Sequence, residues 1–216
     1  MEKPIIIIGA GGNARVTLDI LLSNRKKILA FTAKGTEEKD ICGIPVINDE
    51  SVIADFKPED VSLVNGIGSV ASLDLRRYVF EKFKQYGFSF VSVVHPSALI
   101  ASDVSIGEGT CIGAGVIIEC GAHIRENTII NTKVSVGHDS IIASHVHIAP
   151  GCTLCGNVSV GSCTHIGADT CVIQGIRIGK KTLIGAGSVV VKDIPDGVKA
   201  FGNPARIQDV YADKVI

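Results

Sequence analysis

Residues 130–154 read INTKVSVGHDSIIASHVHIAPGCTL, and an aliphatic residue returns at every sixth position of this stretch. The same spacing extends in both directions, and its seventeen members are Val94, Ile100, Ile106, Ile112, Ile118, Ile124, Ile130, Val136, Ile142, Ile148, Leu154, Val160, Ile166, Val172, Ile178, Ile184 and Val190. A small or β-branched residue follows four positions after the aliphatic one, as at Thr110, Val116, Ala122 and Thr128. We expect short strands in which these two positions point inward. A period held over so many repeats indicates a solenoid.

The six-residue period resembles that of the left-handed parallel β-helix, in which three hexads make one triangular coil of eighteen residues. Seventeen hexads then give between five and six coils. Pro195 is expected to end the repeat, because proline cannot donate a hydrogen bond to the strand ladder. The sequence therefore predicts an all-β left-handed β-helix at residues 94–195 and a C-terminal extension at residues 196–216.

Residues 1–93 have a different pattern, in which expected strands and helices alternate. The expected strands are Ile5–Ile8, Ile28–Thr32, Val61–Val64 and Phe88–Val94, with an amphipathic helix at about Leu73–Tyr86. The sequence GAGGNA at residues 9–14 follows the first strand and opens a helix that reaches about Leu22. This order predicts an α/β, Rossmann-like domain with a small parallel sheet. His95-Pro96 marks the junction, and no Gly/Ser-rich linker separates the two domains.

Composition excludes several classes of partner. The 21 basic and 22 acidic side chains nearly cancel, so the sequence lacks the positive field that binding to nucleic acid or an anionic membrane requires. The apolar run at residues 5–8 is too short for a signal peptide or a membrane span. Seven cysteines are an odd number, which favours reduced thiols over a disulfide framework. We expect a cytoplasmic protein that acts on small molecules.

The turn after the first expected strand fits a phosphate-binding pattern, Gly9-x-Gly11-x-x-Ala14. Glycines at this spacing let the backbone approach a diphosphate at the N-terminus of a helix. The alternative is a plain tight turn of an α/β domain. A dinucleotide site also expects an acidic residue after the second strand, where this chain has Ala33 and Lys34. A nicotinamide cofactor is therefore not expected, and a diphosphate of another kind is the preferred interpretation.

The histidines of the repeat region differ in their hexad positions. His138 occupies a corner position next to Asp139. It is either an ordinary surface residue or a general base whose second ring nitrogen a carboxylate orients. His147 and His165 are eighteen residues apart and are expected to stack on adjacent coils, ~4.8 Å apart and pointing outward.

Two patterns in the repeat region suggest a metal site. His145, His147 and His165 raise the possibility of a zinc site that resembles the one in γ-type carbonic anhydrases, which share the β-helix fold. Cys152 and Cys155 also have a metal-like spacing, but the hexad register turns Cys152 inward, so a core cysteine is favoured. A non-enzymatic binding or scaffold protein on the same β-helix is a further alternative.

Taken together, these motifs resemble those of the bacterial sugar O-acyltransferase and sialic acid O-acetyltransferase family of hexapeptide-repeat acyltransferases. The similarity is strongest to the branch that N-acetylates UDP-linked 4-amino-4,6-dideoxy sugars of the bacillosamine type. It covers nearly the whole chain, and the segments that carry it are residues 9–15, 95–98, 130–132, 137–139, 147–151, 154–158, 184–190 and 202–206. The resemblance implies an acetyl-CoA-dependent acetyltransferase that needs no metal. It also implies a homotrimer with each active site between two subunits.

The resemblance also implies roles for individual residues. It makes His138 the catalytic base and Asp139 the acidic residue that makes His138 more basic. The acetyl-CoA-binding residues that it implies are His147, close to the thioester, and Gly156, Ala168 and Ala186, whose backbone lines the pantetheine slot. The residues implied for the nucleotide diphosphate of the acceptor are Asn13, Ala14 and Arg15, with Gly68 nearby.

The chain departs from the UDP-sugar branch after the second strand, where that branch has acidic residues and this chain has Ala33 and Lys34. The identity of the nucleotide therefore stays open. So does the choice between N-acetylation of an amino sugar and O-acetylation of a sugar such as sialic acid. An amine needs only to be neutral when it attacks, whereas a hydroxyl must lose its proton, and one histidine can serve both reactions.

Overall fold

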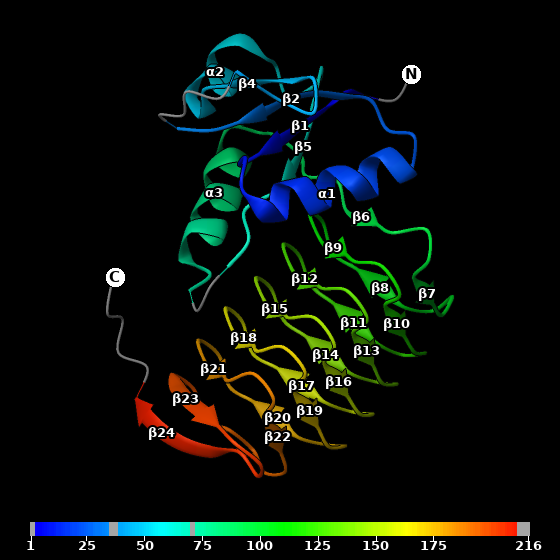
Figure 1. Ribbon diagram of the computed structural model, residues 1–216, viewed down its shortest axis with the longest axis vertical. Coiled ribbons are helices and arrows are strands. Elements are labelled where there is room, and N and C mark those ends of the chain that lie inside the picture. The colour runs from blue at the N-terminus through cyan, green and yellow to red at the C-terminus, as the bar shows by residue number, and fades with distance from the viewer. Residues whose placement is uncertain (1–2, 35–38, 70–71, 211–216) are drawn as a thin grey trace.

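The structure is a computed structural model that describes residues 3–34, 39–69 and 72–210. An α/β domain lies on one end of a β-helix, and the chain enters the first coil directly from the last segment of the α/β domain (Figure 1). The fold class predicted from the hexads and from the alternating N-terminal pattern is confirmed.

The N-terminal domain is built on one sheet with the strand order β3-β4-β2-β1-β5. Its strands are β1 (Ile5–Ile8), β2 (Ile28–Thr32), β3 (Asp40–Ile41), β4 (Ile44–Ile47) and β5 (Ser62–Asn65), and its helices are α1 (Gly12–Ser23), α2 (Asp49–Asp55) and α3 (Asp74–Gln85). All four isoleucines of β1 are buried, as expected for a central parallel strand with both faces covered. One face packs against Leu18 and Leu21 of α1, and the other packs against the aromatic cluster around α3.

The last expected strand of this domain is mostly absent. In place of a continuous strand at residues 88–94, Phe90 forms a single bridge with Leu63, and only β6 (Val93–Val94) is a strand. The segment leaves the edge of the small sheet to pair with β9 (Cys111–Ile112) of the β-helix, so no strand partner accompanies it over its full length.

The β-helix has three faces, each a parallel sheet of two-residue strands except at its C-terminal end. We name each face by its central strand. The β13 face contains β7 (Leu99–Ile100), β10 (Ile117–Ile118), β13 (Ser135–Val136), β16 (Thr153–Leu154), β19 (Cys171–Val172) and β22 (Val189–Val190). The β14 face contains β8 (Ser105–Ile106), β11 (His123–Ile124), β14 (Ile141–Ile142), β17 (Ser159–Val160) and β20 (Arg177–Ile178). The β15 face contains β6, β9, β12 (Ile129–Ile130), β15 (His147–Ile148), β18 (His165–Ile166), β21 (Leu183–Ile184), β23 (Val198–Phe201) and β24 (Arg206–Val210).

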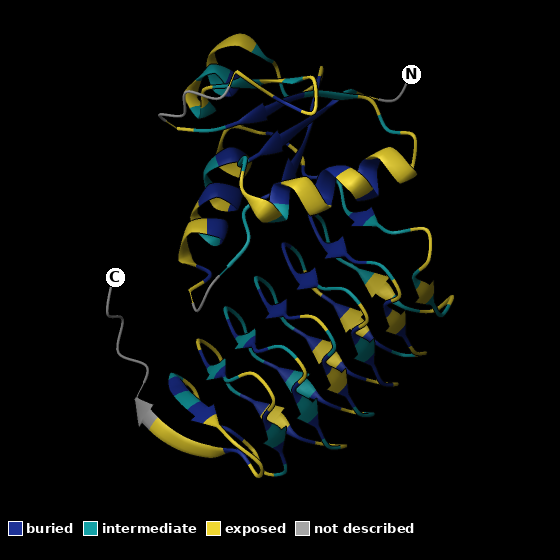
Figure 2. Cartoon of the chain, in the orientation of Figure 1, coloured by how far each residue is buried: buried dark blue, intermediate teal, exposed yellow. Residues whose placement is uncertain are grey.

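The interior of the β-helix is formed by the two residue sets that the period singles out. The aliphatic position is fully buried in the central coils, as at Ile130 and Ile148, and so is the position four residues later, as at Val134. Figure 2 shows this buried lining along the coils. Each buried isoleucine contributes roughly 1.5–3 kcal/mol. Inward hydroxyls are satisfied by carbonyls of the neighbouring coil, as in the bond from Ser140 Oγ to Cys155 O at 3.3 Å.

Strand pairing continues beyond Pro195 on the β15 face. Here β23 pairs in parallel with β21, and β24 folds back antiparallel to β23. Just before Pro195, Ile194 bridges Ile178 of the β14 face. The hairpin of β23 and β24 therefore extends the β15 face past the last hexad, whereas the β13 and β14 faces end at β22 and β20.

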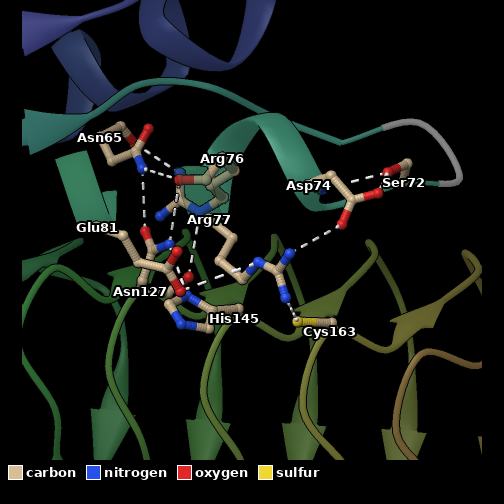
Figure 3. A network of polar contacts seen from close by, with 9 residues as sticks. All are labelled: Asn65, Ser72, Asp74, Arg76, Arg77, Glu81, Asn127, His145 and Cys163. Carbon is tan, nitrogen blue, oxygen red and sulfur yellow. Dashed lines mark hydrogen bonds and ion pairs between the residues drawn. The ribbon is translucent and has the colours of Figure 1, made fainter. Parts of the chain in front are cut away.

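A buried arginine joins the two domains (Figure 3). Arg76 of α3 is 1% exposed, and its Nη1 donates to the carbonyl oxygens of Asn65 and Ile67, each at 2.7 Å. Its Nε donates to Asn127 O of the β-helix at 3.1 Å, and Asn65 Nδ2 donates to Asn127 Oδ1 at 3.1 Å. Burial lowers the pKa of Arg76 to about 10, so the side chain stays cationic at neutral pH among carbonyl dipoles.

Candidate functional site

The corner between the β13 and β14 faces carries a histidine–carboxylate pair. His138 follows β13, and its Nδ1 lies 2.8 Å from Asp139 Oδ2. Asp139 adopts the left-handed conformation with φ 57°, which turns its carboxylate back toward the ring. Both side chains are exposed, at 57% and 68%. With Nδ1 donating to the carboxylate, a neutral His138 presents the lone pair of Nε2 as a base.

The Nε2 side of His138 faces the next coil at Gly156. A Cβ placed on Gly156 would lie 2.3 Å from His138 Nε2, so only glycine lets the ring occupy this position. Asn157 N donates to His138 O at 2.7 Å and fixes the backbone below the ring. The structure therefore brings together three of the residues expected from the sequence: His138, Asp139 and Gly156.

A second group of expected residues lines a cavity of about 580 Å³ between the N-terminal domain and the β15 face. Its lining consists of Gly9, Gly11, Gly12, Asn13, Val16, Gly66, Ile67, Gly68, Ser69, Asn131 and His147. The two loops that form its upper wall follow β1 and β5, at the carboxyl ends of parallel strands, where α/β sheets bind ligands.

The N-terminus of α1 opens into this cavity. Gly11 is the N-cap, no side chain caps the helix, and its first turn contains no acidic residue. The amide N–H groups at such a helix start, together with the helix dipole, favour an anion. Asn13 Nδ2 donates to Gly66 O at 3.1 Å, which ties the two loops of the upper wall together.

The other residues expected to bind the acceptor have different positions. Ala14 is fully buried against Gly66, so its side chain cannot touch a ligand. Arg15 is exposed on α1 and is not among the described residues that line the cavity. A Cβ on Gly68 would lie 3.0 Å from Asn13 Cβ, so these two residues are in close contact.

His147 lies on the floor of the cavity and is 6% exposed. Its ring packs edge-on against His165 of the next coil with ring centroids 4.9 Å apart, as the eighteen-residue spacing predicts. Both rings project outward from their strands, but the N-terminal domain covers them through Ser69. Burial, with smaller effects from His165 and Arg76, lowers the pKa of His147 to about 3. Burial also lowers the pKa of His165, so both rings are neutral at physiological pH.

His145 does not join these two histidines. Its Nδ1 lies 2.9 Å from Asn127 Nδ2, and its ring packs against Phe80 at 5.8 Å. Among the residues that the structure describes, no group of three His, Cys, Asp or Glu side chains is arranged to hold a metal ion. The described residues therefore contain no assembled set of ligands for the zinc site considered as an alternative.

The expected acetyl-CoA residues fall on two different corners. Gly156 lies on the corner of His138, whereas Ala168 and Ala186 lie between the β15 and β13 faces, one coil apart. Gly187 N donates to Ala168 O at 2.7 Å, which stacks these two turns. The corner of His138 is opposite the β15 face in the triangular cross-section. One chain therefore does not place His138 beside His147.

The cysteines show no redox or metal grouping. Cys152 is fully buried, its Sγ donates to Gly167 O at 3.0 Å, and burial raises the pKa of its thiol to about 11. The prediction of a core cysteine at this position is confirmed. All seven cysteines lie among the described residues and are unpaired.

Sequence reasoning missed three polar residues at the cavity and its edge. Ser69 and Asn131 line the cavity and contact His147.

The third residue, Asp49, lies at the start of α2 and accepts a hydrogen bond from the Thr32 hydroxyl. Gly9 N donates to the same hydroxyl oxygen at 3.2 Å. A carboxylate therefore does lie at the end of β2, but α2 supplies it. The only sequence signal was the helix start at Asn48, whose side chain accepts from Glu50 N.

The β-helix is left-handed and carries a histidine–carboxylate pair at one corner. It is joined to an α/β domain whose cavity is lined by the N-terminus of α1. Together these features define a hexapeptide-repeat acyltransferase. Comparisons with known proteins specify the family. Residues 4–83 match the PglD N-terminal domain. PerB from Caulobacter crescentus, solved with CoA and GDP-perosamine, is 35% identical with a TM-score of 0.89, over 97% of this chain and 99% of that chain. The acetyltransferase domain of PglB from Neisseria gonorrhoeae is 30% identical with a TM-score of 0.90, over 96% and 100%. The chain belongs to the family of bacterial hexapeptide-repeat sugar N-acetyltransferases, as its motifs predicted.

Curated relatives match a shorter part of the chain. The acyl-[acyl-carrier-protein]–UDP-N-acetylglucosamine O-acyltransferase of Stutzerimonas stutzeri is 32% identical over 117 residues, which is 53% of this chain and 45% of that protein. The chain thus spans about half the length of the curated relatives it matches. Within the described ranges, no helix has the length and apolar character needed to cross a membrane.

Proposed function

We propose that this protein transfers the acetyl group of acetyl-CoA to the amino group of an amino-deoxy sugar linked to a nucleoside diphosphate. The observation that carries the proposal is the cavity in which the α1 N-terminus and Asn13 face His147 across the domain boundary. One end of this cavity suits a diphosphate, and the other end lies against the β-helix. The solved relative with CoA and GDP-perosamine supports the same pairing of substrates.

The diphosphate is held by the amides at the start of α1, with Asn13 and Gly68 shaping the turn around it. Ala14 contributes through its backbone, and Arg15 gives positive charge near the helix start. The nucleoside extends toward the end of β2, where Ala33 and Lys34 replace the acidic residues of the UDP-sugar branch and where Asp49 supplies a carboxylate. The identity of the nucleotide stays open among the UDP, GDP, dTDP and CMP groups, and the acceptor screen below separates them.

His138 removes the proton of the nucleophile. The sugar nitrogen attacks the thioester carbonyl and forms the new C–N bond, and His138 Nε2 takes the proton from nitrogen. The tetrahedral intermediate then expels the CoA thiolate, which receives that proton. Asp139 holds Nδ1–H of the ring and stabilises the imidazolium in between. Backbone amides of the turn at Gly156 stabilise the oxyanion.

The two groups of residues require more than one subunit. His138 and Gly156 lie on the corner opposite the β15 face, whereas His147 and the acceptor cavity lie on that face. A homotrimer places the corner of one subunit against the β15 side of its neighbour, and the pantetheine arm of acetyl-CoA then passes between Gly156 of one subunit and Ala168 and Ala186 of the other. This assembly is the one that the resemblance implies.

The location that fits this function is the cytoplasm. Seven unpaired cysteines favour a reducing compartment. With a formal net charge of −1, the chain lacks the positive field that favours binding to nucleic acid or to an anionic membrane.

The test is an acceptor screen with the purified full chain and acetyl-CoA. The panel contains UDP-, GDP-, dTDP- and CMP-linked 4-amino sugars and their 4-hydroxy counterparts, and chromatography reads free CoA and product mass. We expect CoA release with one nucleotide-linked amino sugar and an N-acetylated product. Acetylation of the hydroxy counterparts or of a free sialic acid alone supports the O-acetyltransferase alternative. An absence of CoA release with every acceptor supports the scaffold alternative.

A further inference from the structure

The loop at residues 65–69 connects the N-terminal domain to two histidines of the β-helix. Its last described residue, Ser69, has its Oγ 2.6 Å from His147 Nδ1 and 3.1 Å from His165 Nδ1. Ser69 also lines the cavity with His147. One hydroxyl from the N-terminal domain therefore bridges two neighbouring imidazoles of the β-helix.

Hydrogen-bond donors and acceptors along this chain of contacts can be assigned from one end. Thr132 N donates to Asn131 Oδ1 at 2.7 Å, which leaves Asn131 Nδ2 facing His147 Nε2 at 3.3 Å. An amide NH₂ can only donate, so His147 Nε2 accepts. Burial keeps His147 neutral, and a neutral imidazole carries one N–H, which must therefore be at Nδ1.

The assignment continues through the serine. His147 Nδ1–H donates to Ser69 Oγ, and the single hydroxyl hydrogen of Ser69 remains for His165 Nδ1. His165 then carries its proton at Nε2. The order of the bonds is Asn131 to His147, His147 to Ser69 and Ser69 to His165, with each group donating once.

The loop that carries Ser69 is itself held from behind. Arg76 Nη1 donates to the carbonyl oxygens of Asn65 and Ile67, and Asn65 Oδ1 accepts from Ile67 N at 3.2 Å. Because Arg76 is anchored to the β-helix as well, the position of Ser69 over His147 is set by buried contacts on both sides of the loop.

We propose that Ser69 is a positioning residue for the acetyl-transfer site, because it fixes the ring orientation and the Nδ1–H tautomer of His147. The inference rests on the proposed function only for its kinetic consequence. With its one N–H committed to Ser69, His147 has only an acceptor at Nε2, and in this structure the Asn131 amide occupies that lone pair. A hydrogen-bond donor of the reacting groups that takes the place of the Asn131 amide is oriented by the same lone pair. His147 therefore does not supply a proton, which leaves proton transfer to His138.

The test uses the 216-residue chain, which has six histidines, labelled with ¹⁵N-histidine. Long-range ¹H–¹⁵N correlation reports the protonated nitrogen of each ring, and the variant His147→Gln assigns the His147 signals. In the wild type we expect a proton on Nδ1 of His147 and on Nε2 of His165. In Ser69→Ala we expect both rings to become tautomer mixtures, and Ser69→Thr, which keeps the hydroxyl, restores the wild-type tautomers.

Kinetics provide the second readout. Ser69→Ala is expected to lower kcat about tenfold, the effect of one net hydrogen bond in the transition state, and to change the KM of the acceptor less than twofold, by about the spread of a neutral substitution. The matched control is Ser105→Ala, which removes another serine that bonds a histidine Nδ1, that of His123 at 2.7 Å, on the exposed β14 face. We expect this control to leave kcat and the tautomers of His147 and His165 unchanged.

The outcomes separate this inference from the proposed function. Unchanged tautomers in Ser69→Ala, or a proton on Nε2 of His147 in the wild type, overturn the role of Ser69 even if acetyl transfer is confirmed. Altered tautomers in a protein that acetylates none of the acceptors sustain the role of Ser69 and overturn the proposed function.

Discussion

At the residue scale, the proposed site contains two histidines in different surroundings. His138 is exposed, is oriented by Asp139 and packs on a glycine, whereas His147 is buried and holds its only proton in a bond to Ser69. A pKa of about 3 makes His147 a very weak base at neutral pH. These different surroundings support the different roles that we propose for the two histidines.

His138→Ala is expected to lower kcat by about 10²–10⁴ with little change in the KM of acetyl-CoA, because a base acts in the transition state and contributes little to ground-state binding. Thermal unfolding should be unaffected, since the side chain is exposed and its loss opens no cavity. Steady-state kinetics and calorimetry measure the two effects. His123→Ala, also on an exposed part of the β-helix, is the control. Near wild-type kcat in His138→Ala would assign the base to another group.

Asn13→Ala is expected to raise the KM of the acceptor about tenfold and to spare the KM of acetyl-CoA, because Asn13 shapes the loop at the start of α1. Initial rates with each substrate varied in turn give both constants. Val16→Ala, which lines the same cavity without polar contacts, should change both constants little. If the acetyl-CoA constant alone rises in Asn13→Ala, the N-terminal cavity does not bind the acceptor.

At the element scale, α3 holds the two domains together through Arg76. Removing its guanidinium leaves buried carbonyl oxygens of β5, the following loop and the β-helix without donors. Arg76→Met is therefore expected to lower the free energy of unfolding by about 2–4 kcal/mol. Chemical denaturation at a fixed protein concentration measures the change.

Arg77, the next residue of α3, provides the matched control. It is partly exposed, and its Nη2 lies 3.6 Å from Asp74 Oδ1. Its Nε has no hydrogen-bond partner among the described residues and lies 3.9 Å from Glu81 Oε1. Arg77→Met should change the free energy of unfolding by less than about 1 kcal/mol. If both substitutions lowered the free energy of unfolding equally, the buried hydrogen bonds of Arg76 to carbonyl oxygens would contribute no extra stability.

The buried His147 of β15 makes stability depend on pH. The folded state lowers the pKa of His147 from 6.5 to about 3, so the unfolded chain binds a proton that the folded protein excludes. Stability is then fully present above pH 6.5 and falls as the pH drops toward 3, with a slope of about 1.4 kcal/mol per pH unit from this residue.

We expect the free energy of unfolding to fall by about 2 kcal/mol more in the wild type than in His147→Gln between pH 7.5 and 5.0. Denaturation at both pH values measures it, with the exposed His123→Gln as the control. A wild-type protein with the same pH dependence as His147→Gln would mean that the imidazole takes up its proton in the folded state.

The elements differ in how far the sequence could predict them. The hexads predicted the β-helix because each coil repeats the same packing requirement, so seventeen aliphatic positions report one structure. The hairpin of β3 and β4 was missed because its turn, Cys42-Gly43, has positive φ at both residues, and cysteine is not a turn signal. Ser69 and Arg76 were missed because they act through residues that are 51 to 96 positions distant in the chain. Such contacts leave no local pattern.

At the scale of the whole molecule, the placement of the candidate residues argues for assembly. The cavity that we propose for the acceptor is on the β15 face, and His138, the proposed base, is on the opposite corner of the same β-helix. Exposed apolar side chains lie on the two faces that meet at that corner, namely Leu99 and Ile117 on the β13 face and Ile141 on the β14 face. We expect a stable homotrimer in light scattering, and an active monomer would contradict the two-subunit site.

Complementation between two impaired variants tests the shared site directly. His138→Ala lacks the base and keeps the acceptor cavity, whereas Asn13→Ala has the base and a weakened cavity. If each site takes His138 from one subunit and Asn13 from its neighbour, every mixed trimer contains one intact site. Random reassembly of equal amounts makes three quarters of the trimers mixed. Each of these has one intact site out of three, so about a quarter of wild-type activity should return.

The assay uses an acceptor concentration far below the KM of Asn13→Ala, so that the unmixed variants contribute little. If both residues act within one subunit, no mixed trimer has an intact site and the activity stays at the average of the two variants. The mixture before subunit exchange is the control, because it contains the same chains without hybrid sites.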